Sequence, residues 1–219
     1  MYMISIWQHG KDEAAGEVAD YFTRIREPFE IQRLYESQTI PRALPEYLII
    51  LGGQMSVNDS RKYPYFIEEK RKIREMIKEG RPVLGICLGA QMIAASLGKQ
   101  VYPSPSELGW TRIKGCITPW KELFPEQFTA FQWHNETFNL PAGATSLATG
   151  SVVSNQAFRI GSAIGVQFHP EVTLPIISRW SEHLPQGDRE EIIHGAELFL
   201  RQSRQRCHDI LKMFMRGWI

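Results

Sequence analysis

One cysteine flanked by two glycines, in the stretch GICLGAQMI that begins at Gly85, constrains the fold of this chain more than any other feature. Residues 81–86 are typical of a short buried strand, and residues 88–97 are typical of a buried helix. Cys87 therefore lies on the turn between them. Where a strand reverses directly into a helix, the positions two before and two after the apex come close together, so only small residues fit there. Gly85 and Gly89 occupy these positions.

This turn would present Cys87 at the carboxyl end of a sheet and over the N-terminus of a helix. The partial positive charge of a helix N-terminus favours a thiolate over a thiol, so the position suits a reactive cysteine. The alternative is a buried, inert cysteine in an ordinary strand-to-helix turn. The turn alone does not decide between these interpretations, so the decision depends on the rest of the chain.

A second motif, AIGVQFHPEV, supplies a candidate base downstream. An apolar strand leads into His169, and Pro170 favours extended geometry for the residue before it. Side chains two apart in an extended segment point the same way, so Glu171 can hold one imidazole nitrogen while the other takes a proton from a thiol. Cys87, His169 and Glu171 would then form a triad. The alternative is a histidine that ends a strand and a glutamate that opens the next helix.

A pair of glycines follows the buried strand predicted at residues 46–51. Gly52 and Gly53 would let bare backbone approach a substrate. The backbone N–H groups of Gly53 and of Leu88, the residue after the cysteine, would stabilise the oxyanion that forms in acyl transfer. The alternative is a glycine turn that only ends the strand.

Three segments resemble the class I, or triad-type, glutamine amidotransferase family, and the resemblance covers most of the chain. They are GICLGAQ at residues 85–91, LGGQMSVND at 51–59 and GVQFHPE at 165–171, in the family's order. The elements ELGW at 107–110 and WH at 133–134 are similar to free-standing members related to the amidotransferase domain of GMP synthetase.

The resemblance implies a role for each catalytic residue. Cys87 would attack the side-chain amide of glutamine, His169 would carry the proton to the departing ammonia, and Glu171 would orient His169. Gly53 and Leu88 would donate the oxyanion hydrogen bonds. Water would then release the γ-glutamyl thioester as glutamate. Neither a metal ion nor another cofactor is expected.

The resemblance also implies a substrate pocket. Gln91, one helical turn after the cysteine, would help to hold the amino-acid end of the substrate, and a loop at 133–136 would line the other side. The residues expected to contact the substrate are Gly52, Gln91, Trp133, Asn135 and Glu136. Two positions depart from the family pattern. Gln54 stands where many relatives have proline, and His134-Asn135-Glu136 stands where they have His-Gly-Asp or His-Ser-Asp.

The order of the predicted elements indicates an α/β fold. A chain of 219 residues with 43% hydrophobic content can bury one substantial core, so a single amidotransferase-like domain over residues 1–219 is expected. Alternating strands and helices predict a flavodoxin-like, mostly parallel sheet flanked by helices, and short β-rich segments in the second half predict an antiparallel extension of this mixed sheet.

The predicted strands are residues 4–7, 29–34, 46–51, 81–86, 100–102, 111–117, 128–133, 146–148, 157–160 and 164–168. The predicted helices are residues 13–26, 65–79, 88–97 and 189–214. The apolar residues 213–219 are expected to cover the core rather than to meet a partner.

Charge and cysteine content limit the expected partners. A net charge of +1 gives no indication of a nucleic-acid partner, and no apolar run is long enough to span a membrane. The three cysteines have no paired spacing, which indicates a reducing compartment, and Cys116 and Cys207 are expected to be ordinary buried or half-buried thiols. The first seven residues predict a strand rather than a signal peptide. We therefore expect a cytoplasmic protein.

Two functions fit the same catalytic residues. The chain has no Gly-x-x-x-x-Gly-Lys phosphate loop and no Ser-Gly-Gly-x-Asp-Ser segment, the motifs that would indicate ATP-driven activation of an acceptor. One interpretation is a glutaminase subunit that docks on a separate synthetase. The other is a stand-alone γ-glutamyl peptidase or transferase acting on a small molecule.

Two further classes compete with these. His134, Glu136, His169 and Glu171 are residue types that bind zinc, but no His-Glu-x-x-His helix is present and a triad explains the last two better. A redox or stress protein on a related fold is the stronger rival, because the cysteine of such a turn can also be oxidised. That function leaves the histidine, the glutamate and the glycine pair without a role.

Overall fold

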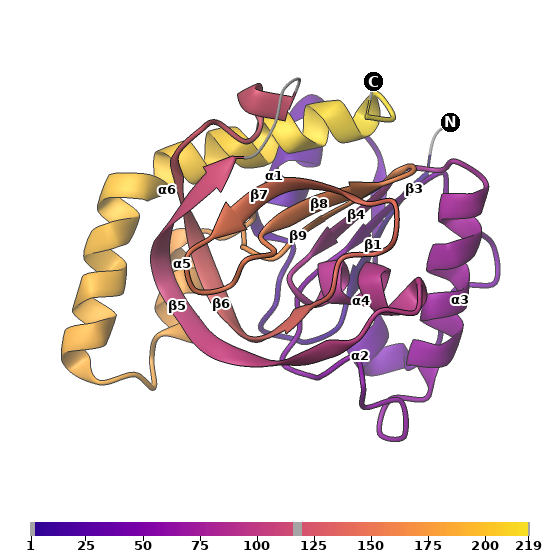
Figure 1. Ribbon diagram of the computed structural model, residues 1–219, viewed down its shortest axis with the longest axis horizontal. Helices are drawn as coiled ribbons and strands as arrows, with labels where there is room; N and C mark the ends of the chain where they lie inside the picture. The colour runs from indigo at the N-terminus through magenta and orange to yellow at the C-terminus, as the bar shows by residue number, and fades with distance from the viewer. Residues whose placement is uncertain (1–2, 116–119, 219) are drawn as a thin grey trace.

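The computed structural model describes residues 3–115 and 120–218, which form a mixed sheet flanked by helices (Figure 1). The nine described strands lie in the order β2-β1-β3-β4-β9-β8-β7-β5-β6. The parallel part contains β1 (Ile4–Gln8), β2 (Phe29–Arg33), β3 (Tyr47–Ile50), β4 (Val83–Ile86) and β9 (Ala163–Val166). The antiparallel part adds β8 (Ala157–Ile160), β7 (Thr145–Gly150), β5 (Val101–Gly115) and β6 (Phe128–Phe138). The predicted α/β class with an antiparallel extension is confirmed.

Strand β5 joins two segments that were predicted to be separate, residues 100–102 and 111–117. The ladder with β6 shifts register between Pro103 and Glu107. Proline cannot donate to a ladder, so an irregularity of this kind lets the strand continue past the prolines. Cys116 and the end of the second predicted segment lie outside the described residues.

Strand β6 contains the segment that was predicted as a loop at residues 133–136. Trp133 lies opposite Leu108 of β5, and His134 lies opposite Glu107. Residues 134–137 are polar, so the hydrophobicity pattern does not indicate a strand there. The partner strand β5 nevertheless supplies the backbone hydrogen bonds of this segment. One wall of the predicted pocket is therefore a strand.

Helices cover both faces of the sheet. Helices α1 (Gly16–Ile25) and α6 (Gln186–Met215) pack on one face, and α3 (Tyr65–Lys78) and α4 (Leu88–Ser96) pack on the other. Three short elements were not predicted, because they are too short for a periodic signal: α2 (Leu34–Ser37), the 3₁₀ helix η1 (Trp120–Glu122) and α5 (Leu174–Trp180). None of the described helices is long and apolar enough to cross a bilayer.

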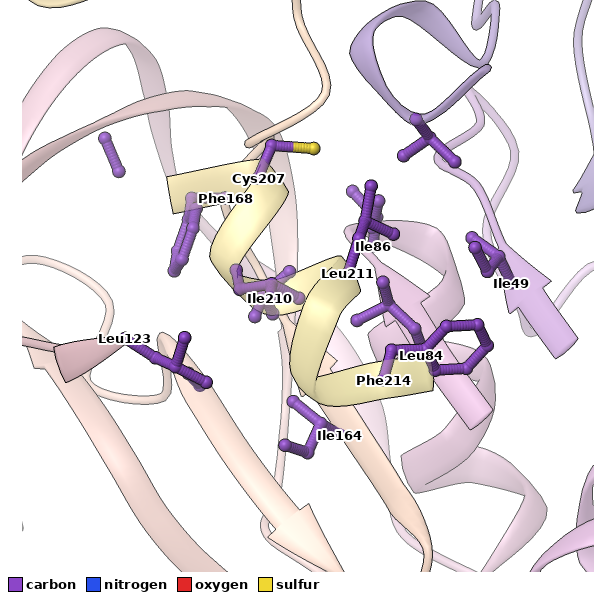
Figure 2. Packing of buried hydrophobic residues seen from close by; sticks show 14 of the residues in the cluster. Ile49, Leu84, Ile86, Leu123, Ile164, Phe168, Cys207, Ile210, Leu211 and Phe214 are labelled. Atoms are coloured by element: carbon purple, nitrogen blue, oxygen red, sulfur yellow. The ribbon is translucent and has the colours of Figure 1, made fainter. Parts of the chain in front are cut away.

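Helix α6 closes the core on its face of the sheet. Ile210, Leu211 and Phe214 point toward the apolar side chains of the central strands (Figure 2). Phe214 is fully buried and Trp218 is 2% exposed, with its indole N–H donating to the Ser162 carbonyl at 2.9 Å. Burial of each large apolar side chain contributes about 1.5–3 kcal/mol. The prediction that the last residues cover the core is confirmed for these two aromatic residues.

A third apolar cluster joins α5 and the first half of α6 to β6. Phe131 of β6 packs against Ile177 and Trp180 of α5 and against Ile192 of α6. This cluster positions Trp180 against the ring of His169, at the carboxyl end of β9.

Candidate active site

The turn at Cys87 has the geometry that its glycines predicted. Cys87 stands between β4 and α4 with φ of 51° and ψ of −105°. A positive φ is costly for a residue with a Cβ, and the turn is held by a hydrogen bond from the Cys87 N–H to the Val166 carbonyl at 2.8 Å. A Cβ on Gly85 would lie 2.5 Å from the Gly89 carbonyl, and one on Gly89 would lie 2.2 Å from the Ile50 carbonyl oxygen. Both positions therefore require glycine.

His169 and Glu171 lie side by side, as their spacing predicted. Nδ1 of His169 is 2.7 Å from Oε1 of Glu171, and the side chains are only 2% and 4% exposed. The backbone N–H of His169 donates to the Phe131 carbonyl at 2.8 Å. The imidazole ring meets the Trp180 ring edge-on, with 4.9 Å between the ring centroids. Nε2 of His169 has no hydrogen-bond partner among the described residues. The ring is fixed on one side and free to exchange a proton on the other.

Gly52 lies against both the imidazole and the cysteine. A Cβ at this position would lie 2.9 Å from Cε1 of His169 and 3.7 Å from Cβ of Cys87. Burial opposes the charged form of His169, but the charges of Glu171 and Cys87 outweigh burial and raise its pKa well above the ordinary value. The surroundings therefore favour a charged imidazolium at His169.

A side-chain amide and a backbone carbonyl also lie near the sulfur of Cys87. Nε2 of Gln167 lies 3.7 Å from Sγ, and the carbonyl oxygen of Trp133 lies 3.9 Å from it. Gln167 was missed in the sequence analysis, although its place two residues before His169 in an extended segment puts both side chains on the same side.

Gly53 lies against Leu88. A Cβ on Gly53 would be 2.6 Å from Cδ2 of Leu88, which is the first residue of α4, and 2.6 Å from Sδ of Met55. The two backbone segments predicted to form an oxyanion hole are thus adjacent, beside the cysteine. A side chain larger than hydrogen at Gly53 would have to displace its neighbours.

A cavity of about 740 Å³ opens over Cys87. This volume lies within the range typical of small-molecule sites. The predicted site residues in its wall are Gly53, Cys87, Gln91, Trp133, Asn135, Glu136 and His169. The cavity also extends to residues that the sequence did not indicate, among them Asp12, Glu13 and Arg179.

Gln91 joins two walls of this cavity. Its Nε2 donates to the backbone carbonyl of Glu136 at 3.0 Å, and the side chain is almost fully buried. The amide therefore holds α4 against β6. Gly52, also expected to touch the substrate, contacts the His169 ring instead of lying at the open surface of the cavity.

A buried polar network supports the β6 wall and was missed in the sequence analysis. Gln156 donates to Glu107 at 2.9 Å and accepts from Gln132 at 2.7 Å. His134 places Nε2 3.1 Å from Gln132 Oε1 and 3.3 Å from Glu107 Oε2. The residues weighed as zinc ligands therefore fall into different pairs, since His134 meets Glu107 and His169 meets Glu171. Among the described residues, no group of three or more His, Cys, Asp or Glu side chains could hold a metal ion.

Two further buried groups near the site were also missed. His9 follows β1 directly, and its Nε2 lies 2.9 Å from Oε1 of Glu69, with both side chains fully buried. A Cβ on Gly53 would be 3.1 Å from Cβ of His9, so His9 lies close to the glycine pair.

The second group is Glu13, in the wall of the cavity. Burial raises the pKa of Glu13, while a hydrogen bond from Gln54 opposes the rise. The position of His9 at the carboxyl end of a strand was the only local signal for either group.

Comparison with known proteins agrees with this geometry. A sequence model described as "Glutamine amidotransferase class-I" matches residues 14–176. The chain is 30% identical over 189 residues to the glutamine amidotransferase-like protein YfeJ of Salmonella typhimurium, covering 81% of this chain and 79% of that protein. It is 33% identical over 105 residues to a subunit of glutamine-hydrolysing GMP synthase from Methanospirillum hungatei, covering 45% of this chain and 55% of that relative.

Solved structures show the same fold. A glutamine amidotransferase from Thermotoga maritima superposes with a TM-score of 0.89 at 30% identity, covering 97% of both chains. One from Methylobacillus flagellatus superposes with a TM-score of 0.91 at 24% identity, covering 99% of this chain and 95% of the other. The resemblance seen in the three sequence motifs is confirmed, and the chain belongs to the class I glutamine amidotransferase family.

Proposed function

We propose that this protein hydrolyses the γ-amide of glutamine, or a related γ-glutamyl bond, through a thioester on Cys87. The observation that carries the proposal is the buried His169–Glu171 pair, whose imidazole lies against Gly52, as Cys87 does. A cysteine at a helix N-terminus is an activated nucleophile when a fixed imidazole lies next to it.

The reaction proceeds in two halves. The Cys87 thiolate attacks the γ-carbonyl carbon, and the negative charge moves to the carbonyl oxygen, where the N–H groups of Gly53 and Leu88 stabilise it. The C–N bond then breaks, and His169 donates its proton to the leaving nitrogen. In the second half His169 takes a proton from water, the hydroxide attacks the thioester, and the sulfur leaves as the electron pair returns to it.

Glu171 acts through the imidazole. Its carboxylate accepts the Nδ1–H of His169 and stabilises the charged ring at each step. The amino-acid end of the γ-glutamyl group lies, in this proposal, along Gln91 and the strand that carries Trp133, Asn135 and Glu136.

The leaving group defines a second candidate function, a stand-alone γ-glutamyl peptidase or transferase. The size of the cavity favours it, because the wall continues past the catalytic residues to Asp12, Arg179 and His183. A group larger than ammonia has room there. A glutaminase that passes ammonia to a separate synthetase remains the other form of the proposal, and the Methanospirillum relative is named as one subunit of a GMP synthase. In either form we propose one cytoplasmic domain that needs no cofactor.

A redox or stress function uses less of the site. It assigns a role to Cys87 alone, whereas the site also holds the His169–Glu171 pair and the glycine loop beside Leu88. Amide hydrolysis uses all of these groups.

The test is the release of ammonia and glutamate by the purified protein, on glutamine and on a panel of γ-glutamyl peptides, with Cys87→Ser as the control. We expect release that depends on Cys87, fastest for the compound that fills the cavity. Release that continues in Cys87→Ser would contradict the proposal. Oxidation of Cys87 by peroxide without cleavage of any γ-glutamyl compound would favour the redox function.

A further inference from the structure

Gln167 is a fully buried amide whose side chain meets the catalytic sulfur. It follows β9 directly, and its backbone N–H donates to the Gln156 carbonyl at 2.8 Å, which fixes its position. The neighbouring strand pair places Ile86 beside Val166, so the next residues, Cys87 and Gln167, also lie side by side. Nε2 of Gln167 then lies 3.7 Å from Sγ.

We infer that Gln167 is a catalytic residue that donates an N–H hydrogen bond to the Cys87 thiolate. The inference rests on the proposed function only in taking Cys87 as the nucleophile. An amide N–H stabilises a neighbouring anion but has no proton to give up, so its role differs from that of His169.

Packing does not explain an amide at this position. Oε1 of Gln167 is buried and has no hydrogen-bond partner among the described residues. A buried unsatisfied polar atom costs stability, and an apolar side chain of similar length would avoid that cost. Gln156 provides the contrast, because its amide donates to Glu107 and to Val153 and accepts from Gln132. A side chain that lowers stability but contacts a reacting atom is expected at a functional site.

Besides His169, the Trp133 carbonyl and the Gln167 amide contact the sulfur, and these two groups favour different protonation states of it. The Trp133 carbonyl can only accept, so it favours the neutral thiol, which donates to it. The Gln167 amide N–H donates, so it favours the thiolate. Without Gln167 the carbonyl would remain, and the balance at Cys87 would move toward the thiol.

The same hydrogen bond assists the second half of the reaction. When the thioester forms, the sulfur shares its electron pair with the acyl carbon and becomes a weaker acceptor. When water attacks and the C–S bond breaks, the pair returns to sulfur and the hydrogen bond to Gln167 strengthens. The interaction is therefore stronger where charge develops, which is the condition for catalysis.

The experiment is the rate of iodoacetamide alkylation of Cys87 in the intact chain as a function of pH, followed by mass spectrometry of the Cys87 peptide. The variants are Gln167→Met, which removes the donor at similar length, and Gln167→Glu, which replaces it with a carboxyl group. Gln156→Met is the matched control, because it removes a buried amide that does not touch sulfur. The melting temperature of each variant is measured in parallel.

We expect the alkylation midpoint of Gln167→Met to rise by about one pH unit, with a rate about tenfold lower below the midpoint and no lower at its high-pH limit. Its melting temperature should not fall. Gln167→Glu should raise the midpoint further. Gln156→Met should lower the melting temperature and leave the midpoint unchanged.

An unchanged midpoint in folded Gln167→Met, or a midpoint that shifts equally in Gln156→Met, would overturn the inference while leaving Cys87 as the nucleophile. A wild-type Cys87 that is not alkylated at any pH would instead contradict the proposed function, and the role of Gln167 would fall with it.

Discussion

Nδ1 of His169 lies 2.7 Å from Oε1 of Glu171, in a pair whose side chains are almost completely buried. Burial works against charge on the imidazole, but the neighbouring carboxylate and cysteine more than compensate and raise the pKa of His169. The pair therefore keeps a proton ready beside Cys87, and several measurable consequences depend on it.

Replacement of Glu171 by Gln should slow turnover without abolishing it. We expect a loss of about 10⁴-fold in kcat, against about 10⁶-fold for Cys87→Ser, because the carboxylate orients the base and does not react. Steady-state kinetics of both variants on the same substrate, with circular dichroism as the check on folding, measure this order. Equal activity in wild type and Glu171→Gln would remove Glu171 from the site.

The same variant should change how stability depends on pH. Because the pKa of His169 is raised in the folded protein, its contribution to stability is complete below about pH 6.5, the ordinary value, and is lost as the pH rises through the folded value. Glu171→Gln should therefore be less stable than wild type at pH 6, and the difference should shrink as the pH rises. Urea unfolding from pH 6 to 9 measures it, and a difference that grows with pH would show the opposite sign of coupling.

Cys87 and Cys207 should differ sharply in reactivity. Burial, with the charges of Glu171 and Glu17, raises the pKa of Cys207 well above the ordinary value, whereas Cys87 opens into the cavity. A thiol reagent at neutral pH should modify Cys87 in the native protein and modify Cys207 only after unfolding. Peptide mapping after timed labelling gives the two rates, and similar native rates at both sites would contradict the structure.

Gly52→Ala should reduce activity more than it reduces stability. The new Cβ would lie 2.9 Å from Cε1 of His169, so the imidazole must move away from its position beside Cys87. The matched control is Gly187→Ala, where a Cβ meets no atom within 4 Å. We expect kcat to fall at least tenfold in the first variant and to stay near wild type in the second. Comparable kinetics in the two variants would show that the ring tolerates the displacement.

Removal of the buried carboxylate at Glu69 should destabilise the fold. Glu69→Leu leaves Nε2 of His9 without its partner at 2.9 Å, in a place where both side chains are fully buried, and should cost about 3 kcal/mol. Glu68→Leu, on the same helix, removes an exposed pair with Arg71 and should leave the free energy of unfolding almost unchanged. Denaturant unfolding of both variants tests the contrast, and equal losses would mean that burial of the pair has no effect.

The sequence predicted those parts of the site that depend on local geometry. Cys87 between Gly85 and Gly89, and His169 two residues before Glu171, are fixed by the conformation of short segments, and the structure places them as expected. The predicted helices follow from apolar periodicity that is visible in the sequence, and the structure differs from the prediction at their ends.

What the sequence did not predict depends on partners far along the chain. The spacing of Gln167 from His169 indicates that both side chains lie on the same side, but it does not indicate the contact of Gln167 with a cysteine 80 residues earlier. The strand at Trp133 is stabilised by pairing with β5, which lies elsewhere in the sequence. Its own residues do not show the regular alternation of polar and apolar side chains that would predict a strand. The Glu107–His134 contact likewise follows from strand register and could not be derived from either segment alone.

We propose that Cys87 attacks the side-chain carbonyl carbon of a γ-glutamyl group bound in this cavity, and an electrophilic diazoketone analogue of glutamine tests this directly. Intact mass and peptide mapping should show one analogue per chain, attached to Cys87, with labelling slowed by glutamine and absent in Cys87→Ser and in unfolded protein. Labelling that glutamine does not slow, or that falls on another residue while Cys87 stays free, would contradict the account.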